Sequence, residues 1–365
     1  MNIGILTHYN VYNLGAQLQM YAMKYWLEAH GHHVYILTYE KNFDFDKSEE
    51  KKNSGSFGNF AYYIKHYLFG KGLASTLFNT RKVLALKKTF KHVEIAPYDH
   101  NNCDAIIIGS DEVFSIDVGC NKMMYGHGLG KVPAIAYAPA FGRTTEELLE
   151  KFDCYDLVQD GLSKMYALSA RDEHTKEMIF AMTGREVPMV CDPVLLCEGK
   201  RLYTSVKTIG KKYMLVYSYD RNMINSNEIN AIQSYARKHD LVTVSAGTHH
   251  KWCDRNIVCT AGEWYTYFRE ADCVVTDTFH GSVVAMKNHC NVAVYIRESI
   301  NAFKLESLLE ETGIQDRRLP EITEEYLETI LAKTIDYHKV DRKIDQMVQY
   351  SESYLIGELE KLNGQ

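Results

Sequence analysis

The chain has 365 residues, of which 46% are hydrophobic and 24% are charged, a balance typical of globular proteins. At roughly 150 residues per domain, this length predicts about two domains. The formal net charge of −6 argues against a general nucleic-acid-binding protein. No apolar run reaches the roughly 18 residues that a membrane-spanning helix needs.

The first residues and the cysteines indicate the compartment. Residues 1–6 lack the basic region of a signal peptide, so we expect a cytoplasmic protein. The nine cysteines form no C-x-x-C pair, and several lie in apolar runs, which predicts reduced, buried thiols. The histidines and cysteines lack the spacing of a metal site, so we expect no metal ion.

The first half of the chain alternates short apolar runs with helical patterns. Apolar and aromatic residues at i, i+3, i+4 and i+7 from Leu18 predict a helix over residues 13–29. The apolar runs predict strands at 3–7, 33–39, 105–109, 134–138, 165–169 and 187–191.

The second half repeats this alternation and then ends in a long amphipathic pattern. We predict strands at 213–218, 241–245, 256–259, 273–276 and 292–296, and helices at 226–239 and 337–362. The fold class is therefore α/β, with two Rossmann-like domains at residues 1–205 and 206–335. We expect the C-terminal helix, within 336–365, to pack back on the first domain.

Residues 41–92 are an insertion in the alternating strands and helices of the first half of the chain. Residues 44–58 are polar and expected to be mobile, and we interpret the D-x-D pattern at 44–46 as coincidence. Residues 59–92 contain seven lysines and arginines, seven aromatic residues and no acidic residue. This stretch is either a solvated basic face or a weak contact with an anionic membrane surface or polyanionic ligand.

The segment 7–19 leads from the first predicted strand into the first helix. Ligands of open α/β sheets bind at the carboxyl ends of the strands, and helix N-termini favour anions. We therefore expect Asn13, Gly15 and Gln17 to bind substrate, with Asn13 as the helix N-cap. The segment is not a G-x-G-x-x-G or P-loop motif, so it implies no nucleotide cofactor. An ordinary strand–helix turn is the alternative.

Two further strand ends carry polar side chains. The apolar run from residue 105 ends in Ser110 and Asp111, which places a carboxylate at the sheet edge, and we expect Ser110 to bind substrate. Arg171 follows the predicted strand 165–169, and its guanidinium suits phosphate or carboxylate groups. The alternatives are a helix N-cap for Asp111 and a structural salt bridge for Arg171.

A fourth strand end places an acid and a histidine together. The run 273–276 delivers Asp277 and His280 to its carboxyl end, and Gly281 and Ser282 open the next helix. Imidazole is the side chain best able to exchange protons near neutral pH, so we predict a catalytic role for His280. A structural histidine is the alternative.

Taken in order, these segments resemble the polysaccharide pyruvyl transferase family. The matching motifs lie at 13–22, 104–114, 136–142, 169–172, 192–196, 271–281 and 301–317. The resemblance implies a GT-B-like fold, with two Rossmann-like domains facing across a cleft. It also implies transfer of a pyruvyl group from phosphoenolpyruvate to two hydroxyls of a sugar in a cell-envelope, capsular or exopolysaccharide precursor, which releases phosphate and needs no cofactor.

The resemblance also implies roles for individual residues. The family's histidine falls on His280, the expected general acid, and its arginine falls on Arg171, the expected ligand of the donor's anionic groups. Some members carry an arginine at the position of Thr278, so we expect Arg297 to supply the second cation. The remaining residues of the expected donor site are Thr278, Gly281 and Ser282.

The chemistry requires these residue types. Phosphoenolpyruvate carries a phosphate and a carboxylate, so its site needs fixed cations. Its enol carbon must gain a proton, which His280 can supply, while Asp277 or Asp111 orients groups or accepts the hydroxyl proton. We expect a saccharide acceptor, free or lipid-linked, and a weak peripheral contact of 59–92 with the inner membrane face.

Two other functions stay open from the sequence. One is a sugar-nucleotide glycosyltransferase of the GT-B type, and the other is a non-catalytic saccharide-binding protein. The threonine at position 278 leaves the last alternative open, because it replaces a cation of the family's site.

Overall fold

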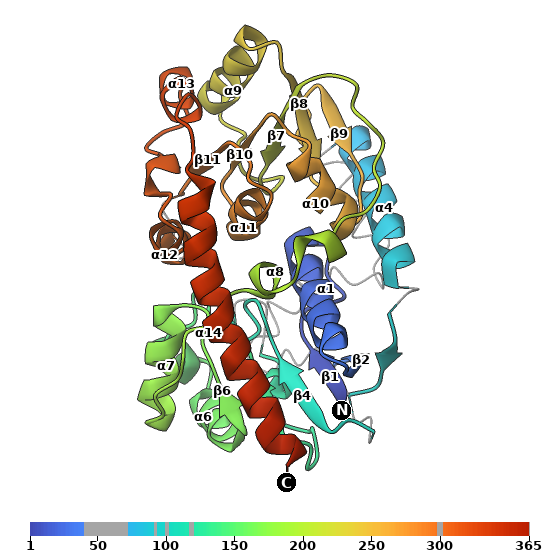
Figure 1. The fold of residues 1–365 in the computed structure, drawn as a ribbon, viewed down its shortest axis with the longest axis vertical. Coiled ribbons are helices and arrows are strands. Elements are labelled where there is room, and N and C mark those ends of the chain that lie inside the picture. The colour runs from blue at the N-terminus through green and yellow to red at the C-terminus, as the bar shows by residue number, and fades with distance from the viewer. Residues whose placement is uncertain (40–71, 91–92, 99–101, 117–119, 298–301, 365) are drawn as a thin grey trace.

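A computed structural model describes residues 1–39, 72–90, 93–98, 102–116, 120–297 and 302–364 (Figure 1). The predicted mobile stretch 44–58, its D-x-D pattern, and residues 59–71 of the basic, aromatic stretch lie outside the described residues.

The first half of the chain forms a six-stranded parallel sheet. Its order is β3 (Ile95–Ala96), β2 (His33–Leu37), β1 (Asn2–Leu6), β4 (Ala105–Ile108), β5 (Ala134–Ala136) and β6 (Ala167–Leu168). The chain order reverses between β1 and β4, which is the topological switch point where open α/β sheets bind ligands.

The second half forms another six-stranded parallel sheet of the same topology. Its order is β12 (Arg318–Leu319), β11 (Val292–Tyr295), β10 (Cys273–Thr276), β7 (Tyr213–Tyr217), β8 (Val242–Ala246) and β9 (Arg255–Ile257). Its switch point lies between β7 and β10. The prediction of two Rossmann-like βαβ series is confirmed.

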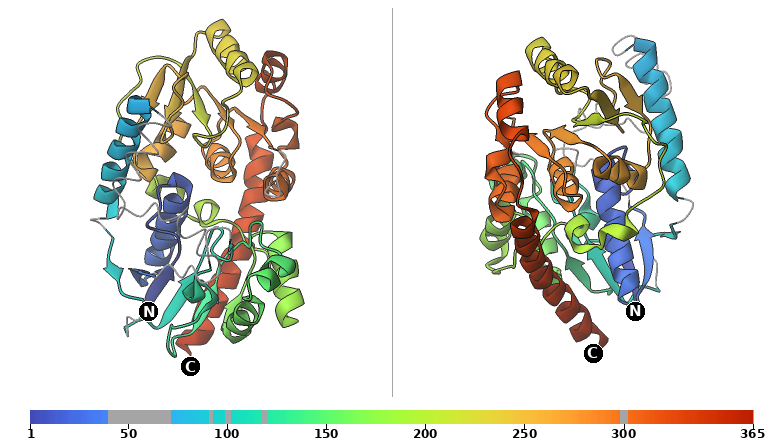
Figure 2. Two further views of the ribbon diagram at one scale, coloured as in Figure 1. Left: turned by 180° about the vertical axis from the view of Figure 1, so that it is seen from behind. Right: turned by 45° about the horizontal axis from the view of Figure 1, so that its top comes forward.

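Helices surround both sheets (Figures 1 and 2). They are α1 (Leu14–Ala29), α4 (Gly72–Thr89), α5 (Glu146–Lys151), α6 (Tyr155–Lys164), α7 (Glu173–Thr183), α8 (Pro193–Leu196), α9 (Ser226–Lys238), α10 (Ala261–Arg269), α11 (Phe279–Lys287), α12 (Ala302–Thr312), α13 (Glu324–Leu331) and α14 (Tyr337–Asn363). Short 3₁₀ helices lie at Lys122–Tyr125, Gly199–Arg201 and Gln315–Arg317.

Alternate strand residues enter different cores, as the two-residue period of a strand requires. In β4, Ile107 joins one apolar cluster, whereas Ile106 and Ile108 join another. The cluster of Ile107 also contains Leu215 of β7 and Val274 of β10, so a single core is continuous between the two sheets.

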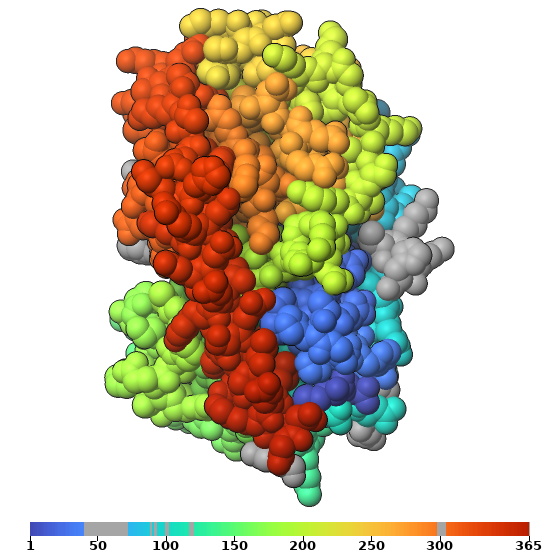
Figure 3. All heavy atoms as spheres, viewed as in Figure 1, coloured from blue at the N-terminus to red at the C-terminus, as the bar shows by residue number. Residues whose placement is uncertain are grey.

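Two helices connect the halves of the molecule. Helix α1 is buried along most of its length and packs against both α8 and α10. Helix α14 crosses both halves at the surface (Figure 3). It is held to the first half by Trp26 Nε1, which donates to Glu352 at 2.9 Å, and by Cys191 N, which donates to Ser351 at 2.9 Å. The division at residue 205 stays a prediction.

The element predictions fail in two places. Residues 187–191 are not a strand, because the only ladder contact in this run is an isolated bridge between Met189 and Ala170. Val187, Val190 and Cys191 are buried without a strand. The edge strands β3 and β12 were not predicted, because each has only two residues and carries no readable period. All nine cysteines are buried, as predicted.

Candidate functional site

Polar side chains from the two halves of the chain meet at the switch points. Asp111 follows β4, Arg171 follows β6 and His280 lies in the first turn of α11, after β10. The carboxyl ends of parallel strands meet at one edge of a sheet, so each half brings its polar loops to one edge. The core that is continuous between the sheets holds these two edges together.

The centre of the site is the carboxylate of Asp192, the N-cap of α8. Its Oδ1 accepts a hydrogen bond from Val194 N at 2.9 Å. Its Oδ2 lies 3.5 Å from Arg171 Nη1 and 3.4 Å from His280 Nε2. Arg171 Nη1 also donates to Asp111 Oδ1 at 3.4 Å. The structure therefore brings together the guanidinium and the imidazole that the sequence singled out.

Several buried polar atoms of this cluster make no hydrogen bond within the described chain. They are Nε and Nη2 of Arg171, Oδ2 of Asp192 and Nε2 of His280. The Arg171 side chain is only 3% exposed, so water cannot freely satisfy it. Asp192 Oδ2 and His280 Nε2 face each other at ion-pair distance, whereas Nε and Nη2 of Arg171 make no hydrogen bond in the described chain. Buried polar groups are almost always paired, so these two nitrogens are candidates to bind a ligand. The open edge of the guanidinium suits a two-oxygen anion.

Contacts with an aromatic ring and with a glycine fix the positions of the Arg171 and His280 side chains. The guanidinium carbon of Arg171 lies 4.8 Å from the ring centroid of Phe279, which holds its plane. A Cβ added at Gly15 would lie 2.5 Å from the His280 ring, so only glycine allows α1 to approach this closely. Thr278 caps α11 by accepting from Gly281 N at 3.0 Å.

The electrostatics of the cluster favour ionised forms. Burial opposes the charge of Asp111, but His280, Arg171 and Lys304 outweigh it and lower the pKa of Asp111 below its usual range. Burial also opposes the charge of Arg171, yet Asp111 and Asp192 raise its pKa above the ordinary value. The guanidinium and the Asp111 carboxylate are therefore both charged in the folded protein.

Asp277 and Arg297 form a second network beside α11. Arg297 Nε lies 2.5 Å from Asp277 Oδ2, and its two terminal nitrogens each lie 3.2 Å from the carboxylate of Glu228. Asn222 Nδ2 also donates to Asp277 Oδ2, at 2.9 Å. Two carboxylates thus neutralise the cation that the sequence proposed as the partner of Arg171. Asp277 Oδ1 stays buried without a hydrogen bond in the described chain.

The other predicted binding residues hold the loops of the site. Asn13 accepts from Gly15 N at 2.9 Å, as the predicted N-cap. Gln17 Nε2 donates to Val11 O at 3.0 Å, while its buried Oε1 has no hydrogen bond in the described chain. Ser110 is fully buried and its hydroxyl donates to Ala138 O at 2.7 Å, so the structure gives it a supporting position.

Ser282 also has a local partner. Its hydroxyl donates to Thr278 O at 3.0 Å, within the first turn of α11. Thr278, Gly281 and Ser282 therefore shape the start of the helix that carries His280. Their contact with the donor stays a prediction.

Sequence reasoning assigned no role to two residues of the site. Asp192 stood in a matched motif, and the only local signal for it was an aspartate before the proline that begins α8. Lys304 of α12 forms an ion pair with Glu112, next to Asp111. No local pattern indicates that a lysine on α12 reaches the loop after β4, because nearly two hundred residues separate them.

Comparisons with known proteins agree on family and fold. A family model for polysaccharide pyruvyl transferase matches residues 13–299. No curated protein matches the chain.

Three solved structures illustrate the similarity in fold. UGT73P12 from Glycyrrhiza uralensis, complexed with glycyrrhetinic acid 3-O-monoglucuronide, is 8% identical, with a TM-score of 0.52 and coverage of 100% of this chain and 96% of that chain. OtsA is 10% identical, with a TM-score of 0.50 and coverage of 98% and 99%. The glycosyltransferase SnogD from Streptomyces nogalater is 11% identical, with a TM-score of 0.47 and coverage of 96% and 95%. The fold is of the GT-B type, as predicted.

The described ranges bear on a membrane-spanning helix and on a metal site. None of the described helices combines the length and the apolar character needed to cross a bilayer. The described His, Cys, Asp and Glu side chains form no group of three or more that could hold a metal ion.

Gly15→Ala tests the close approach of α1 to His280. The added methyl group must displace the imidazole, so we expect a loss of about 1–3 kcal/mol in the free energy of unfolding. Denaturant unfolding measures this loss. Gly357→Ala is the matched control, because a Cβ at Gly357 meets no atom within 4 Å, and it should unfold like the wild type or slightly later. Equal stability of the two variants would contradict the packing described here.

The lowered pKa of Asp111 predicts how stability depends on pH. The ionised carboxylate stabilises the fold at pH values above its unfolded pKa of about 4, and this contribution is lost as pH falls below that value. Wild type should therefore be more stable than Asp111→Asn at pH 7, with the difference shrinking below about pH 4. Unfolding measured across this pH range checks the sign of the difference in stability. A difference between wild type and Asp111→Asn that grows as pH falls would contradict the prediction.

Proposed function

This chain belongs to the polysaccharide pyruvyl transferase family, and we propose that it transfers a pyruvyl group from phosphoenolpyruvate to two hydroxyls of a saccharide. The proposed acceptor is a free or lipid-linked precursor of a cell-envelope, capsular or exopolysaccharide, and the proposed compartment is the cytoplasm. The observation that carries the proposal is that the side chains of Arg171 and His280 both lie against one oxygen of Asp192.

Donor binding is assigned to the open edge of Arg171. Its Nε and Nη2 are buried and make no hydrogen bond in the described chain, so an anion placed there gains two charge-assisted hydrogen bonds. A doubly anionic donor needs a further cation. Lys304 is a candidate because it lies beside the Asp111 loop, and Arg297 is the other, although Asp277 and Glu228 already pair with it.

His280 is proposed as the general acid. Its proton goes to the methylene carbon of phosphoenolpyruvate, which becomes a methyl group and leaves the adjacent carbon electrophilic. The Asp192 carboxylate, 3.4 Å from His280 Nε2, holds the imidazole in position for this step. General acid catalysis of this kind contributes about 10²–10⁴-fold to a rate.

The acceptor then forms two C–O bonds in succession. A sugar hydroxyl adds to the electrophilic carbon and loses its proton to Asp111 or Asp277. The bond from that carbon to the phosphate oxygen breaks, and inorganic phosphate leaves. A second hydroxyl of the same sugar adds to that carbon and passes its proton to His280, which closes the cyclic ketal and restores the general acid. Holding donor and acceptor in contact can contribute up to roughly 7–11 kcal/mol.

Substitution of His280 and of Arg171 tests this mechanism. With phosphoenolpyruvate and a panel of galactose- and mannose-bearing acceptors, His280→Gln should lose at least about 100-fold in phosphate release while still binding the donor. Arg171→Gln should lose donor binding, measured by calorimetry. His289→Gln is the control, because His289 lies on the surface and pairs with Asp341.

Other results would favour other functions. Equal turnover by wild type and both variants would remove the two residues from the mechanism. Stabilisation by UDP- or GDP-sugars and none by phosphoenolpyruvate would favour a sugar-nucleotide glycosyltransferase. Saccharide binding without turnover of any donor would favour a non-catalytic binding protein.

The outward face of α4 supports a weak peripheral contact with a membrane. Leu73 and Leu77 are 76% and 53% exposed, Arg81 and Lys87 are exposed near them, and the helix contains no acidic residue. Exposed leucines among cations suit the interface of an anionic bilayer.

Co-sedimentation with phosphatidylglycerol vesicles tests this contact. Wild type should pellet at low salt and release at high salt, because the attraction is screened. Leu73→Gln combined with Leu77→Gln should reduce pelleting, whereas Ile224→Gln, which changes an exposed side chain of the second half, should not. If neither salt nor the paired substitution reduces pelleting, the outward face of α4 is excluded as the membrane contact.

A further inference from the structure

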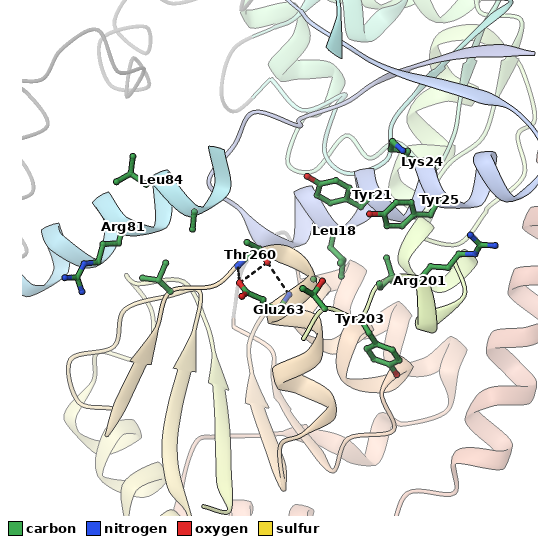
Figure 4. Close-up of a pocket in the computed structure, with 15 residues that line it drawn as sticks. Leu18, Tyr21, Lys24, Tyr25, Arg81, Leu84, Arg201, Tyr203, Thr260 and Glu263 are labelled. Atoms are coloured by element: carbon green, nitrogen blue, oxygen red, sulfur yellow. Dashed lines mark hydrogen bonds between the residues drawn. The ribbon is translucent and has the colours of Figure 1, made fainter. Parts of the chain in front are cut away.

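A cavity lies away from the Arg171–His280 cluster. It has a volume of about 800 Å³ and is bounded by α1, α4, residues 201–204 and the start of α10 (Figure 4). This volume lies within the range of ligand-binding pockets, roughly 300–1,000 Å³. None of its lining residues belongs to the cluster around Asp192.

The middle of the cavity has an aromatic wall. Tyr21 and Tyr25 project from neighbouring turns of α1 with their rings stacked, 6.0 Å apart at the centroids and inclined by 25°. Tyr203 forms part of the opposite side, and its ring is held by Arg269, whose guanidinium carbon lies 4.1 Å from the centroid. Fixed tyrosines offer an apolar face with a polar edge, which suits a sugar ring.

The charged groups of the cavity are unevenly neutralised. Lys24 is paired with Glu28 at 2.5 Å, and the Glu263 carboxylate accepts from Thr260 N at 2.8 Å in the capping box of α10. By contrast, Arg81 and Arg201 are exposed cations of the lining, although Arg201 Nε also lies 3.5 Å from Glu198 Oε2 at the surface. Figure 4 shows them at opposite ends of the cavity, with the tyrosines of α1 between them.

We propose that this cavity is a binding site for an acidic saccharide chain, with sugar rings over Tyr21 and Tyr25 and carboxylate or phosphate groups at Arg81 and Arg201. The separation of the two cations favours an extended chain over a single small anion. The inference rests on the proposed function for its ligand class, a saccharide, but it does not depend on pyruvyl transfer.

The site is positioned to hold the part of a saccharide that does not react. Leu18 of the cavity is one helical turn along α1 from Gly15, which contacts His280. A chain bound along the cavity therefore lies beside the end of α1 that reaches the catalytic cluster. Binding energy gained at a distance from the reacting atoms can be used to orient the acceptor.

Titration calorimetry with a galacturonic acid tetramer tests the proposal, with its methyl ester as a neutral probe of the same shape. Wild type should bind the tetramer, should bind the ester less tightly, and should lose affinity as salt is raised. Arg81→Gln combined with Arg201→Gln should weaken binding about tenfold. Tyr25→Leu should also weaken binding, whereas Arg237→Gln, on the surface of α9, should not.

A compact anion tests whether an extended chain is needed. A sugar diphosphate that binds more tightly than the tetramer, with the same dependence on Arg81 and Arg201, would overturn the proposal of an extended chain. No binding of either probe, equal binding of the methyl ester, or no effect of the paired arginine substitution would overturn the proposal. His280→Gln should bind the tetramer like wild type, so loss of pyruvyl transfer and loss of this site are distinguishable.

Discussion

One oxygen atom, Oδ2 of Asp192, lies within 3.5 Å of both Arg171 Nη1 and His280 Nε2. The arginine comes from the first half of the chain and the histidine from the second, so this carboxylate is where the two halves meet electrostatically. Its buried position strengthens both interactions, because the local dielectric constant is low. Nε and Nη2 on the other edge of the guanidinium make no hydrogen bond within the described chain. The proposed donor anion would bind at this edge.

Two repeated sheets explain why this meeting is possible. Each sheet reverses its strand order once, and each reversal leaves polar loops at the carboxyl edge. The core that runs between the sheets through α1 and α8 holds the edges together, and α14 spans the junction on the outside. Gly15 shows how tight the junction is, because any side chain there would meet the His280 ring. The position of the His280 ring and the packing of the two halves therefore depend on the same contacts.

Charge pairing distinguishes the arginines, whose suitability as ligand sites could not be compared from the sequence. Arg171 faces two carboxylates but has two nitrogen atoms without a hydrogen bond in the described chain, whereas Arg297 is held by both Asp277 and Glu228. Arg81 and Arg201 lie at opposite ends of a separate cavity. A guanidinium becomes a ligand site only when its surroundings leave part of its fork open, and that depends on packing rather than on position in the sequence.

The sequence alone determined the α/β class, most of the strands and helices, the cap of α1, and the strand ends that carry Asp111, Arg171 and His280. These follow from local periodicity and from the rule that ligands bind at carboxyl strand ends. Only the tertiary structure decided that Asp192 lies between Arg171 and His280, that Lys304 reaches Glu112, and that residues 187–191 form no strand. Each of these depends on contacts between segments far apart in the chain, for which a local pattern carries no signal.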